Sequence, residues 1–501
     1  MYLLLWLSLL FVSLARLWSS FGGKKKKNVY PLPPGPMGVP ILGNLHMLGS
    51  LPHRSLHKFA KKYGPIMFIR LGLVPTVVVS SPEAAELFLK THDYNFASRP
   101  PVQSAKYLHY GNKGLAFSQY GPYWRNIRKL CTLELLTNLK VEMFKPMRTD
   151  AMGGLVESVK IAAEARDVVD LSAMTQTVLG DMTYRMLFRR GDRVEIESTI
   201  QEALRLTGLF NLGDYIPYVG TLDPQGINRR LKNVSKVIDK YLEQIIDEHM
   251  RDAHEKRSRN DMDFVDVMLS LMHSKDTENQ YGLDRPNIKA ILLDMLEGGM
   301  DTSATAIEWG FSEVMKHPRV LKRVQEELRS VVGMDRMVDE ADISKLEYLN
   351  MVVKESMRLH PVGPLLAPHE SMEDLTINGY HIPKKSRIII NAWVIGRDPR
   401  VWSENAEEFY PERFIGTNID VRGHDFKLLP FGSGRRSCPA IQLALTVVTI
   451  VLAQMLHCFD WELPNGMLPE DLDMNEKFGL AVSRANPLLA TPTFRLSIHR
   501  M

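Results

Sequence analysis

The stretch from Phe431 to Ala440 combines glycines, two arginines and one cysteine directly before an apolar helical pattern. The glycines allow positive φ or a close approach of the backbone to a ligand. An arginine guanidinium can hold a carboxylate through two parallel hydrogen bonds. A cysteine at a helix N-terminus lies where free N–H groups and the helix dipole favour the thiolate. A haem, with its iron and two propionates, requires this combination of groups.

Two simpler interpretations of the stretch remain open. A Gly- and Ser-rich segment before a helix is usually only a loop, and a lone cysteine is usually a small buried apolar residue. A dinucleotide-binding loop is disfavoured, because the spacing of the glycines breaks the dinucleotide fingerprint at its last position.

The stretch resembles the haem-binding signature of the cytochrome P450 superfamily, Phe-x-x-Gly-x-Arg-x-Cys-x-Gly. Phe431, Gly434, Arg436 and Cys438 match this signature, whereas Ala440 stands where the family usually has glycine. The resemblance implies that Cys438 is the axial thiolate ligand of a haem b iron and that the other three residues bind the cofactor. The extra methyl group of Ala440 raises the question of how the following helix packs.

Trp124 and Arg128 are four residues apart in a helical pattern, so they share a face of that helix. The pair means little alone, because such residues occur on many helix faces. The resemblance implies that both residues hold a haem propionate, together with Arg436 and with His369, which follows a Pro-rich turn. Without the resemblance, His369 would be read as an ordinary hydrogen-bonding residue.

An apolar stripe at helical spacing runs from Ile288 to Val314 and passes through Gly298-Gly299-Met300-Asp301-Thr302. We expect one long helix with a central distortion, where the Thr302 hydroxyl can bind a ligand instead of its own backbone. The alternative is that Asp301 and Thr302 cap a new helix. The resemblance implies that Asp301 and Thr302 are catalytic and organise water for proton delivery.

Glu355 and Arg358 are three residues apart on a predicted helix, which by itself would indicate a surface ion pair of little energetic value. With Arg413, they match the buried Glu-Arg-Arg triad of the family. The resemblance therefore implies a structural role for all three residues, not a catalytic one.

The resemblance also implies a substrate pocket that is mostly apolar, which fits lipophilic substrates. The chain looks most like the plant microsomal A-type branch, whose members hydroxylate phenylpropanoids, flavonoids and terpenoids. The segment from Ser98 to Phe117 shows little periodicity and predicts a long functional loop. The pocket residues implied by family position are Tyr107, Leu108, Leu209, Phe210, Asp294, Gly298, Leu365, Leu366, Phe478 and Leu480.

The composition of the 501 residues is that of a globular protein, with 45% hydrophobic and 24% charged residues. The net charge of +4 is too small to indicate nucleic-acid binding. The cysteines, Cys131, Cys438 and Cys458, are an odd and sparse set, which argues against a disulfide framework and for a reducing compartment.

The first 21 residues are almost wholly apolar, and Lys24 to Lys27 follow them. A cleaved signal peptide is the alternative, but the basic cluster follows the apolar run instead of preceding it. We therefore expect a transmembrane anchor over residues 1–21, a basic and Pro-rich linker over 22–36 and a catalytic domain over 37–501. Lysines mark the cytosolic side, so the domain is predicted to be cytosolic on a single-pass endoplasmic reticulum protein.

Together these observations predict the family's mainly α fold with a minor β part, as one large haem domain behind the anchor. The implied activity is haem-thiolate monooxygenation of a lipophilic small molecule with dioxygen. Because the chain has no nicotinamide or flavin motif, electrons are expected from NADPH through cytochrome P450 reductase, with cytochrome b5 as a second candidate partner. A basic face near Arg435 would suit an acidic partner. A haem-thiolate isomerase or dehydratase, a non-catalytic haem-binding protein and a membrane scaffold remain alternatives.

Overall fold

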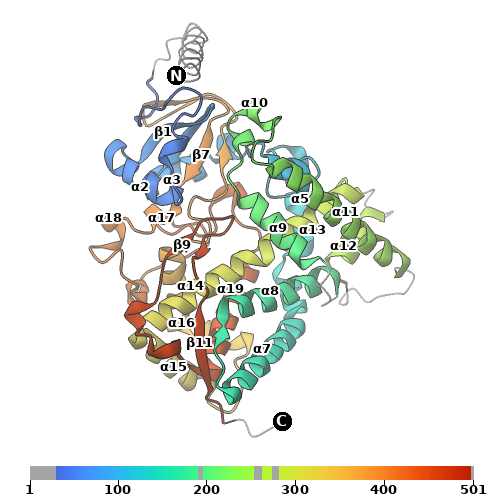
Figure 1. Cartoon of the computed structure of the whole chain (residues 1–501), viewed down its shortest axis with the longest axis vertical. Helices are drawn as coiled ribbons and strands as arrows, with labels where there is room; N and C mark the ends of the chain where they lie inside the picture. Colours follow the sequence, from blue (N-terminus) through green and yellow to red (C-terminus); the bar gives the residue numbers. More distant parts are fainter. Residues whose placement is uncertain (1–29, 190–195, 253–261, 274–280, 498–501) are drawn as a thin grey trace, which may run out of the picture.

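The computed structural model describes residues 30–189, 196–252, 262–273 and 281–497 of the chain (Figure 1). The predicted anchor and the beginning of the linker lie outside the described residues. The described part is mainly α-helical with small sheets, which confirms the predicted fold class. The longer helices are α2 Pro52–Tyr63, α5 Pro122–Leu130, α7 Lys145–Ala165, α8 Leu171–Phe188, α9 Glu197–Gly208, α11 Ile227–Asp252, α12 Phe264–His273, α13 Arg285–Gly299, α14 Asp301–Lys316, α15 Pro318–Val332, α16 Glu347–Leu359 and α19 Ile441–Cys458.

Short helices lie in the connections between these elements. The loop predicted over Ser98 to Phe117 contains one of them, α4, so this part of the prediction was incomplete. The short α-helices are α3 Pro82–Glu86, α4 Gln103–Leu108, α6 Asn138–Met143, α10 Pro217–Gly220, α17 Ala392–Ile395 and α18 Pro399–Trp402.

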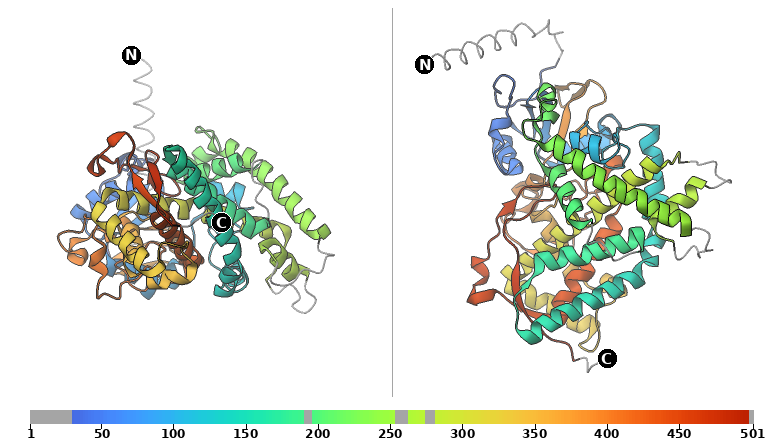
Figure 2. Two further views of the ribbon diagram at one scale, coloured as in Figure 1. Left: turned by 90° about the horizontal axis from the view of Figure 1, so that it is seen from below. Right: turned by 45° about the vertical axis from the view of Figure 1, so that its right-hand side comes forward.

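The largest described sheet has the strand order β1-β2-β7-β4 and lies at the end of the long axis opposite α7 and β11 (Figure 1; Figure 2). Strands β1 and β2 form a hairpin around Gly72, where φ is +61°, and β7 pairs with β2 in parallel. The other sheets are β3-β11-β8, β5-β6 and β9-β10. The strands are β1 Ile66–Leu71, β2 Val74–Val79, β3 Val169–Asp170, β4 His369–Glu370, β5 Leu375–Ile377, β6 Tyr380–Ile382, β7 Arg387–Ile390, β8 Phe459–Glu462, β9 Glu476–Lys477, β10 Ser483–Arg484 and β11 Leu489–Phe494.

Helix α14 lies at the centre of the helical part and packs against α8, α16 and α19. Its residues from Ser303 to Met315 are all buried, and the two carboxylates among them, Glu308 and Glu313, are hydrogen-bonded to Ser172 and His360 respectively. The predicted long helix is interrupted at Met300, so that α13 ends at Gly299 and α14 begins at Asp301. The two adjacent glycines predicted this distortion.

Helix α19 begins directly after the cysteine loop and is the one described helix long and apolar enough to cross a membrane. Its apolar stretch is 67% buried inside the protein, among the residues of the largest hydrophobic cluster. We therefore assign α19 to the core of the helical part.

Candidate active site

A cavity lies between the cysteine loop and the break between α13 and α14. Helices α5, α8 and α19 and the segment from Leu115 to Phe117 complete its wall. Ten of the residues proposed from the sequence line this cavity: Trp124, Arg128, Asp294, Gly298, Thr302, Leu366, His369, Phe431, Arg436 and Cys438.

Cys438 faces the cavity from the loop that precedes α19. Its backbone N–H donates to the Phe431 carbonyl at 3.0 Å, and its Sγ accepts from the Ala440 N–H at 3.4 Å. Burial raises the pKa of the Cys438 thiol, and the Ala440 N–H and Arg128 offset only part of this effect. The helix terminus therefore does not by itself favour the thiolate as the sequence suggested, whereas coordination of a metal cation deprotonates a thiol.

Gly434 is held in a conformation that requires glycine. Its φ is +70°, and a Cβ atom there would lie 2.6 Å from Asp93 Oδ1 and closer still to the Leu89 carbonyl oxygen. Gly434 does not line the cavity; instead, its lack of a side chain lets the loop pack against the segment from Leu89 to Asp93. Ala440 has φ −105° and ψ 25°, which alanine adopts without strain, so its methyl group does not disturb the start of α19.

Positive charge gathers on one side of the cavity. Arg128 and Arg436 lie there as proposed, together with Arg99, which the sequence reading missed. Each guanidinium donates to backbone carbonyl oxygens: Arg99 to Pro368 at 2.9 Å, Arg128 to Ser437 at 2.8 Å and Arg436 to Ala97 at 2.6 Å. None of the three forms an ion pair with a carboxylate of the described residues.

Burial and the closeness of these positive charges lower the pKa values of several groups in the cluster. Burial, with the nearby Arg99 and Arg128, lowers the pKa of Arg436 to about 8. Burial also lowers the pKa of Arg99 to about 10 and, together with Arg99, holds the pKa of His369 well below its usual value. A buried group of cations without a carboxylate partner fits an anionic ligand such as the two propionates of a haem. The donor set is therefore compatible with haem: a cavity-facing cysteine and, beside it, an unneutralised basic cluster.

Trp124 and His369 are near this cluster but already hydrogen-bonded within the protein. The Trp124 indole N–H donates to the Leu115 carbonyl at 3.0 Å, and its ring lies 4.0 Å from the Arg436 guanidinium. His369 is buried, and its Nδ1 lies 2.8 Å from the Phe96 carbonyl oxygen. The Trp124 ring can therefore orient the Arg436 guanidinium, whereas His369 is held by the backbone beside the cluster.

The opposite wall of the cavity contains the break between α13 and α14. Thr302 lines the cavity, and its hydroxyl donates to the Gly298 carbonyl in the last turn of α13 at 2.6 Å. The hydroxyl therefore bonds the backbone across the break, whereas we expected it to be available to a ligand instead. Asp301 does not line the cavity, and burial raises the pKa of its carboxyl group.

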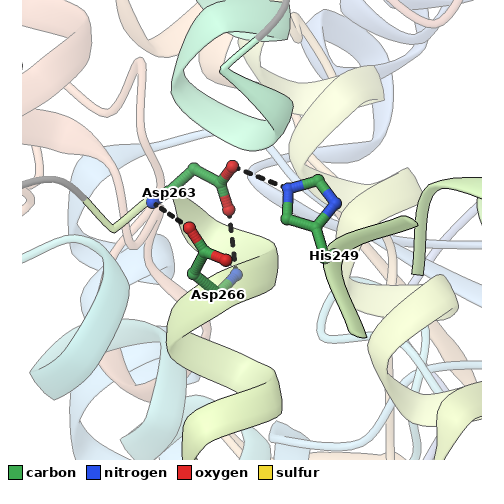
Figure 3. A group of neighbouring side chains, drawn as sticks. All are labelled: His249, Asp263 and Asp266. Carbon is green, nitrogen blue, oxygen red and sulfur yellow. Dashed lines mark hydrogen bonds and ion pairs between the residues drawn. The ribbon is translucent and has the colours of Figure 1, made fainter. Parts of the chain in front are cut away.

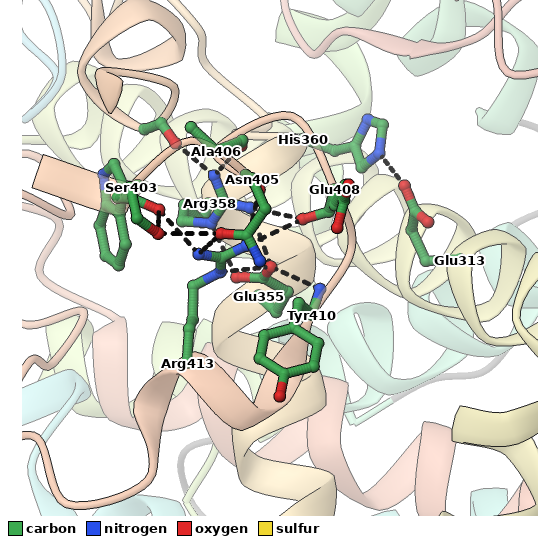
Figure 4. Close-up of polar contacts among 12 residues, drawn as sticks. Glu313, Glu355, Arg358, His360, Ser403, Asn405, Ala406, Glu408, Tyr410 and Arg413 are labelled. Carbon is green, nitrogen blue, oxygen red and sulfur yellow. Dashed lines mark hydrogen bonds and ion pairs between the residues drawn. The ribbon is translucent and has the colours of Figure 1, made fainter. Parts of the chain in front are cut away.

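Glu355, Arg358 and Arg413 form a buried cluster away from the cavity (Figure 4). Arg358 holds the Glu355 carboxylate through two hydrogen bonds of 2.7 and 2.8 Å, and Arg413 donates to it at 2.8 Å. Both arginines also donate to the Glu408 carbonyl, at 3.0 and 3.1 Å. The cluster thus ties α16 to the irregular chain around residues 396–413.

Seven of the proposed pocket residues lie outside the lining of the cavity, because family position does not fix the direction of a side chain. Asp294, Gly298 and Leu366 do line it. Leu108 is buried in a hydrophobic cluster, and Leu365 packs against another. The remaining five are Tyr107, Leu209, Phe210, Phe478 and Leu480, of which the last four are more than one third exposed.

Arg435, near which a basic face is expected, has an acidic neighbour. The Arg435 guanidinium forms an ion pair with Asp93, and its backbone N–H lies 3.3 Å from the same carboxylate. This ion pair offsets the charge of Arg435, whose side chain is 47% exposed, and the basic face stays a prediction.

The fold and this site define a class of helical proteins that bind haem through a cysteine. The chain matches the family "Cytochrome P450" over residues 33–489. It is 56% identical to cytochrome P450 CYP736A12 of Panax ginseng, over 94% of this chain and 95% of the relative. It is 43% identical to cytochrome P450 750A1 of Pinus taeda, over 93% and 91% of the two chains, and 43% identical to cytochrome P450 71AP13 of Prunus mume, over 94% and 92%.

The chain belongs to the cytochrome P450 family. It is a haem-thiolate monooxygenase that uses dioxygen and receives electrons from NADPH through a reductase.

Proposed function

We propose that this monooxygenase hydroxylates a lipophilic small molecule, such as a terpenoid or a phenolic secondary metabolite. The observation that carries the proposal is the chemistry of the cavity wall on the side of α8 and α13. Leu179, Met182, Met186 and Met295 line it there, and flexible methionine side chains adapt to apolar ligands of varied shape. Its few polar side chains, such as Thr183 and Ser303, can orient one oxygen atom of a substrate.

We assign the remaining roles as follows. Cys438 ligates the iron, and Arg99, Arg128 and Arg436 hold the propionates. Haem supplies oxygen activation when bound, and a cysteine ligand favours cleavage of the O–O bond. Thr302 lies at the cavity and Asp301 behind it, where a buried carboxyl with a raised pKa can retain and pass on a proton.

The cellular setting belongs to the same proposal. Residues 1–21 act as a single transmembrane anchor in the endoplasmic reticulum, residues 22–36 as a linker and residues 37–501 as a cytosolic catalytic domain. The apolar run followed by Lys24 to Lys27 supports this arrangement. Cytochrome b5 is a second candidate electron donor besides the reductase.

The first test is the difference spectrum of the reduced full chain with carbon monoxide. A strongly red-shifted Soret band, lost in Cys438→Ser, is expected for thiolate ligation by this residue. The same spectrum in wild type and variant would remove Cys438 as the ligand. Turnover of terpenoids and phenolics with reductase is then measured with and without NADPH and dioxygen.

Product that forms without either co-substrate would favour a haem-thiolate isomerase or dehydratase. A correct spectrum without turnover of any lipophilic compound would contradict the proposed substrate class and favour a haem-binding role.

A further inference from the structure

His109 lies directly after α4 and is completely buried. Its two ring nitrogens face two carboxylates of α13: Nδ1 lies 3.1 Å from Asp294 Oδ1, and Nε2 lies 3.3 Å from Glu297 Oε2. The two acids are three residues apart and therefore share a face of the helix. A neutral imidazole has a lone pair on one nitrogen, which would face a carboxylate. Neither ring nitrogen is aligned for a hydrogen bond, so both contacts are ion pairs, and the two nearby carboxylates favour the imidazolium.

The same carboxylate that contacts His109 also fixes the wall of the cavity. Asp294 accepts the backbone N–H groups of Leu115 and Ala116, the second at 3.3 Å. The ring of Phe117 lies 5.2 Å from the imidazole ring. Residues 115–117 all line the cavity, so Asp294 joins this wall to α13.

The joined segment continues into the basic cluster. The Leu115 carbonyl accepts from the Trp124 indole at 3.0 Å and from Arg436 at 3.4 Å. A displacement of Leu115 would therefore alter both this wall of the cavity and the basic cluster.

The charge balance behind the wall depends on His109. Asp294 and Glu297 of α13 are the charged groups that act on it, and Glu297 is also reached by the Thr207 hydroxyl of α9 at 3.5 Å. Burial lowers the pKa of His109, but Glu297 and Asp294 outweigh burial and raise it to about 10. Removal of one partner from a buried ion pair leaves an uncompensated charge, which is strongly unfavourable.

We propose that the His109 imidazolium is a positioning group that clamps residues 110–117 against α13 and so fixes the wall of the substrate cavity. This inference rests on the proposed function, in which the cavity is the substrate site. It determines which substrates fit by holding Leu115, Ala116 and Phe117 in place.

A second buried histidine provides a matched control (Figure 3). His249 Nε2 lies 2.8 Å from Asp263, and its Nδ1 lies 2.8 Å from the Ile245 carbonyl oxygen. Asp263 in turn accepts the Asp266 N–H at 2.9 Å, so the acids cap the start of α12. This group could reach a metal ion, but its hydrogen bonds account for it as a helix cap. It does not line the cavity.

The experiment uses the full-length holoenzyme and compares His109→Gln with His249→Gln. Amide hydrogen exchange is measured by mass spectrometry on peptides that cover residues 110–118. His109→Gln is expected to raise the exchange rate of these peptides at least about tenfold, because two carboxylates then lack their cation. His249→Gln is expected to leave them unchanged. The ratio of the dissociation constants of 4-phenylimidazole and imidazole should change at least about threefold in His109→Gln alone.

Charge compensation is tested by rescue. The triple variant His109→Gln, Asp294→Asn, Glu297→Gln removes all three charges, while the carboxamide oxygen that Asp294→Asn introduces can still accept the two backbone N–H groups. Exchange should return toward the wild-type rate in the triple variant. Glu297→Gln alone keeps the ion pair between His109 and Asp294, so it is expected to raise exchange less than His109→Gln does. It serves as the test variant if His109→Gln fails to fold.

Unchanged exchange in both His109→Gln and Glu297→Gln would overturn the clamp, as would an equal increase in His249→Gln. The carbon monoxide spectrum is recorded for every sample. A wild-type spectrum without thiolate ligation would contradict the proposed function, whereas the exchange rates would still test the clamp.

Discussion

At the scale of single residues, Gly434 offers a direct test of the cysteine loop. Gly434→Ala should destabilise the fold by at least about 3 kcal/mol, because positive φ and a close backbone neighbour both oppose a Cβ atom. Haem content per chain should fall with it, since Cys438 lies on the same loop. Urea unfolding and pyridine haemochrome absorbance measure the two effects.

Gly416→Ala separates the two causes in this test. Gly416 has φ +69°, close to the +70° of Gly434, but nothing lies within 4 Å of the position that a Cβ atom would take there. Its substitution should cost only about 1–2 kcal/mol for the backbone conformation and leave haem content unchanged. Equal losses in both variants would show that the close approach to Leu89 and Asp93 has no energetic consequence.

Some residues of this site could be predicted from the sequence and others could not. Residue type and spacing carried the signal of Cys438 and Arg436, whereas Arg128 was proposed from the family resemblance; all three line the cavity. Arg99 was missed because it lies in an aperiodic segment and reaches the site only through the fold. The signal that could have found it is an arginine at the start of the long loop, directly before Pro100 and Pro101.

At the scale of elements, the cluster of Glu355, Arg358 and Arg413 should determine how the irregular chain before the cysteine loop is held. Glu355→Gln leaves two buried guanidinium groups without their carboxylate and should destabilise the protein by about 3–5 kcal/mol. The free energy of unfolding in urea measures this loss.

An exposed ion pair provides the contrast for this cluster. Glu86 and Lys90 form an i,i+4 pair with exposed side chains on the surface. Glu86→Gln should change the free energy of unfolding by less than about 0.5 kcal/mol. If Glu355→Gln were equally mild, the cluster would not hold these elements together.

Prediction of elements succeeded where periodicity was strong. The apolar stripe from Ile288 to Val314 predicted both α13 and α14, and Gly298-Gly299 predicted their distortion. The hydroxyl of Thr302 was misjudged, because its choice between a ligand and the Gly298 carbonyl depends on local geometry. Side chains such as Phe210 and Phe478 lie outside the lining of the cavity, because family position does not fix where a side chain points.

At the scale of the whole molecule, a polar contact joins the two ends of the described chain. His53 and Arg54 of α2 lie 3.0 and 2.7 Å from the Glu476 carboxylate of β9. Burial raises the pKa of Glu476, but hydrogen bonds from His53 and the charges of His53 and Arg54 outweigh burial and lower it to about 2. A carboxyl whose pKa is lowered in the folded state stabilises that state at a pH above its unfolded pKa of 4.5.

This contribution should be lost as the pH falls from 4.5 toward 2, and it amounts to about 2 kcal/mol after allowance for solvent screening. Glu476→Gln should therefore be less stable than the wild type at pH 6, and the difference should shrink at pH 3. Urea unfolding at both pH values measures it. Glu326, whose exposed side chain lies 4.0 Å from Lys322, is the control, and Glu326→Gln should show no such pH dependence. A difference between wild type and Glu476→Gln that stays constant from pH 6 to pH 3 would show that packing, and not charge, joins α2 to β9.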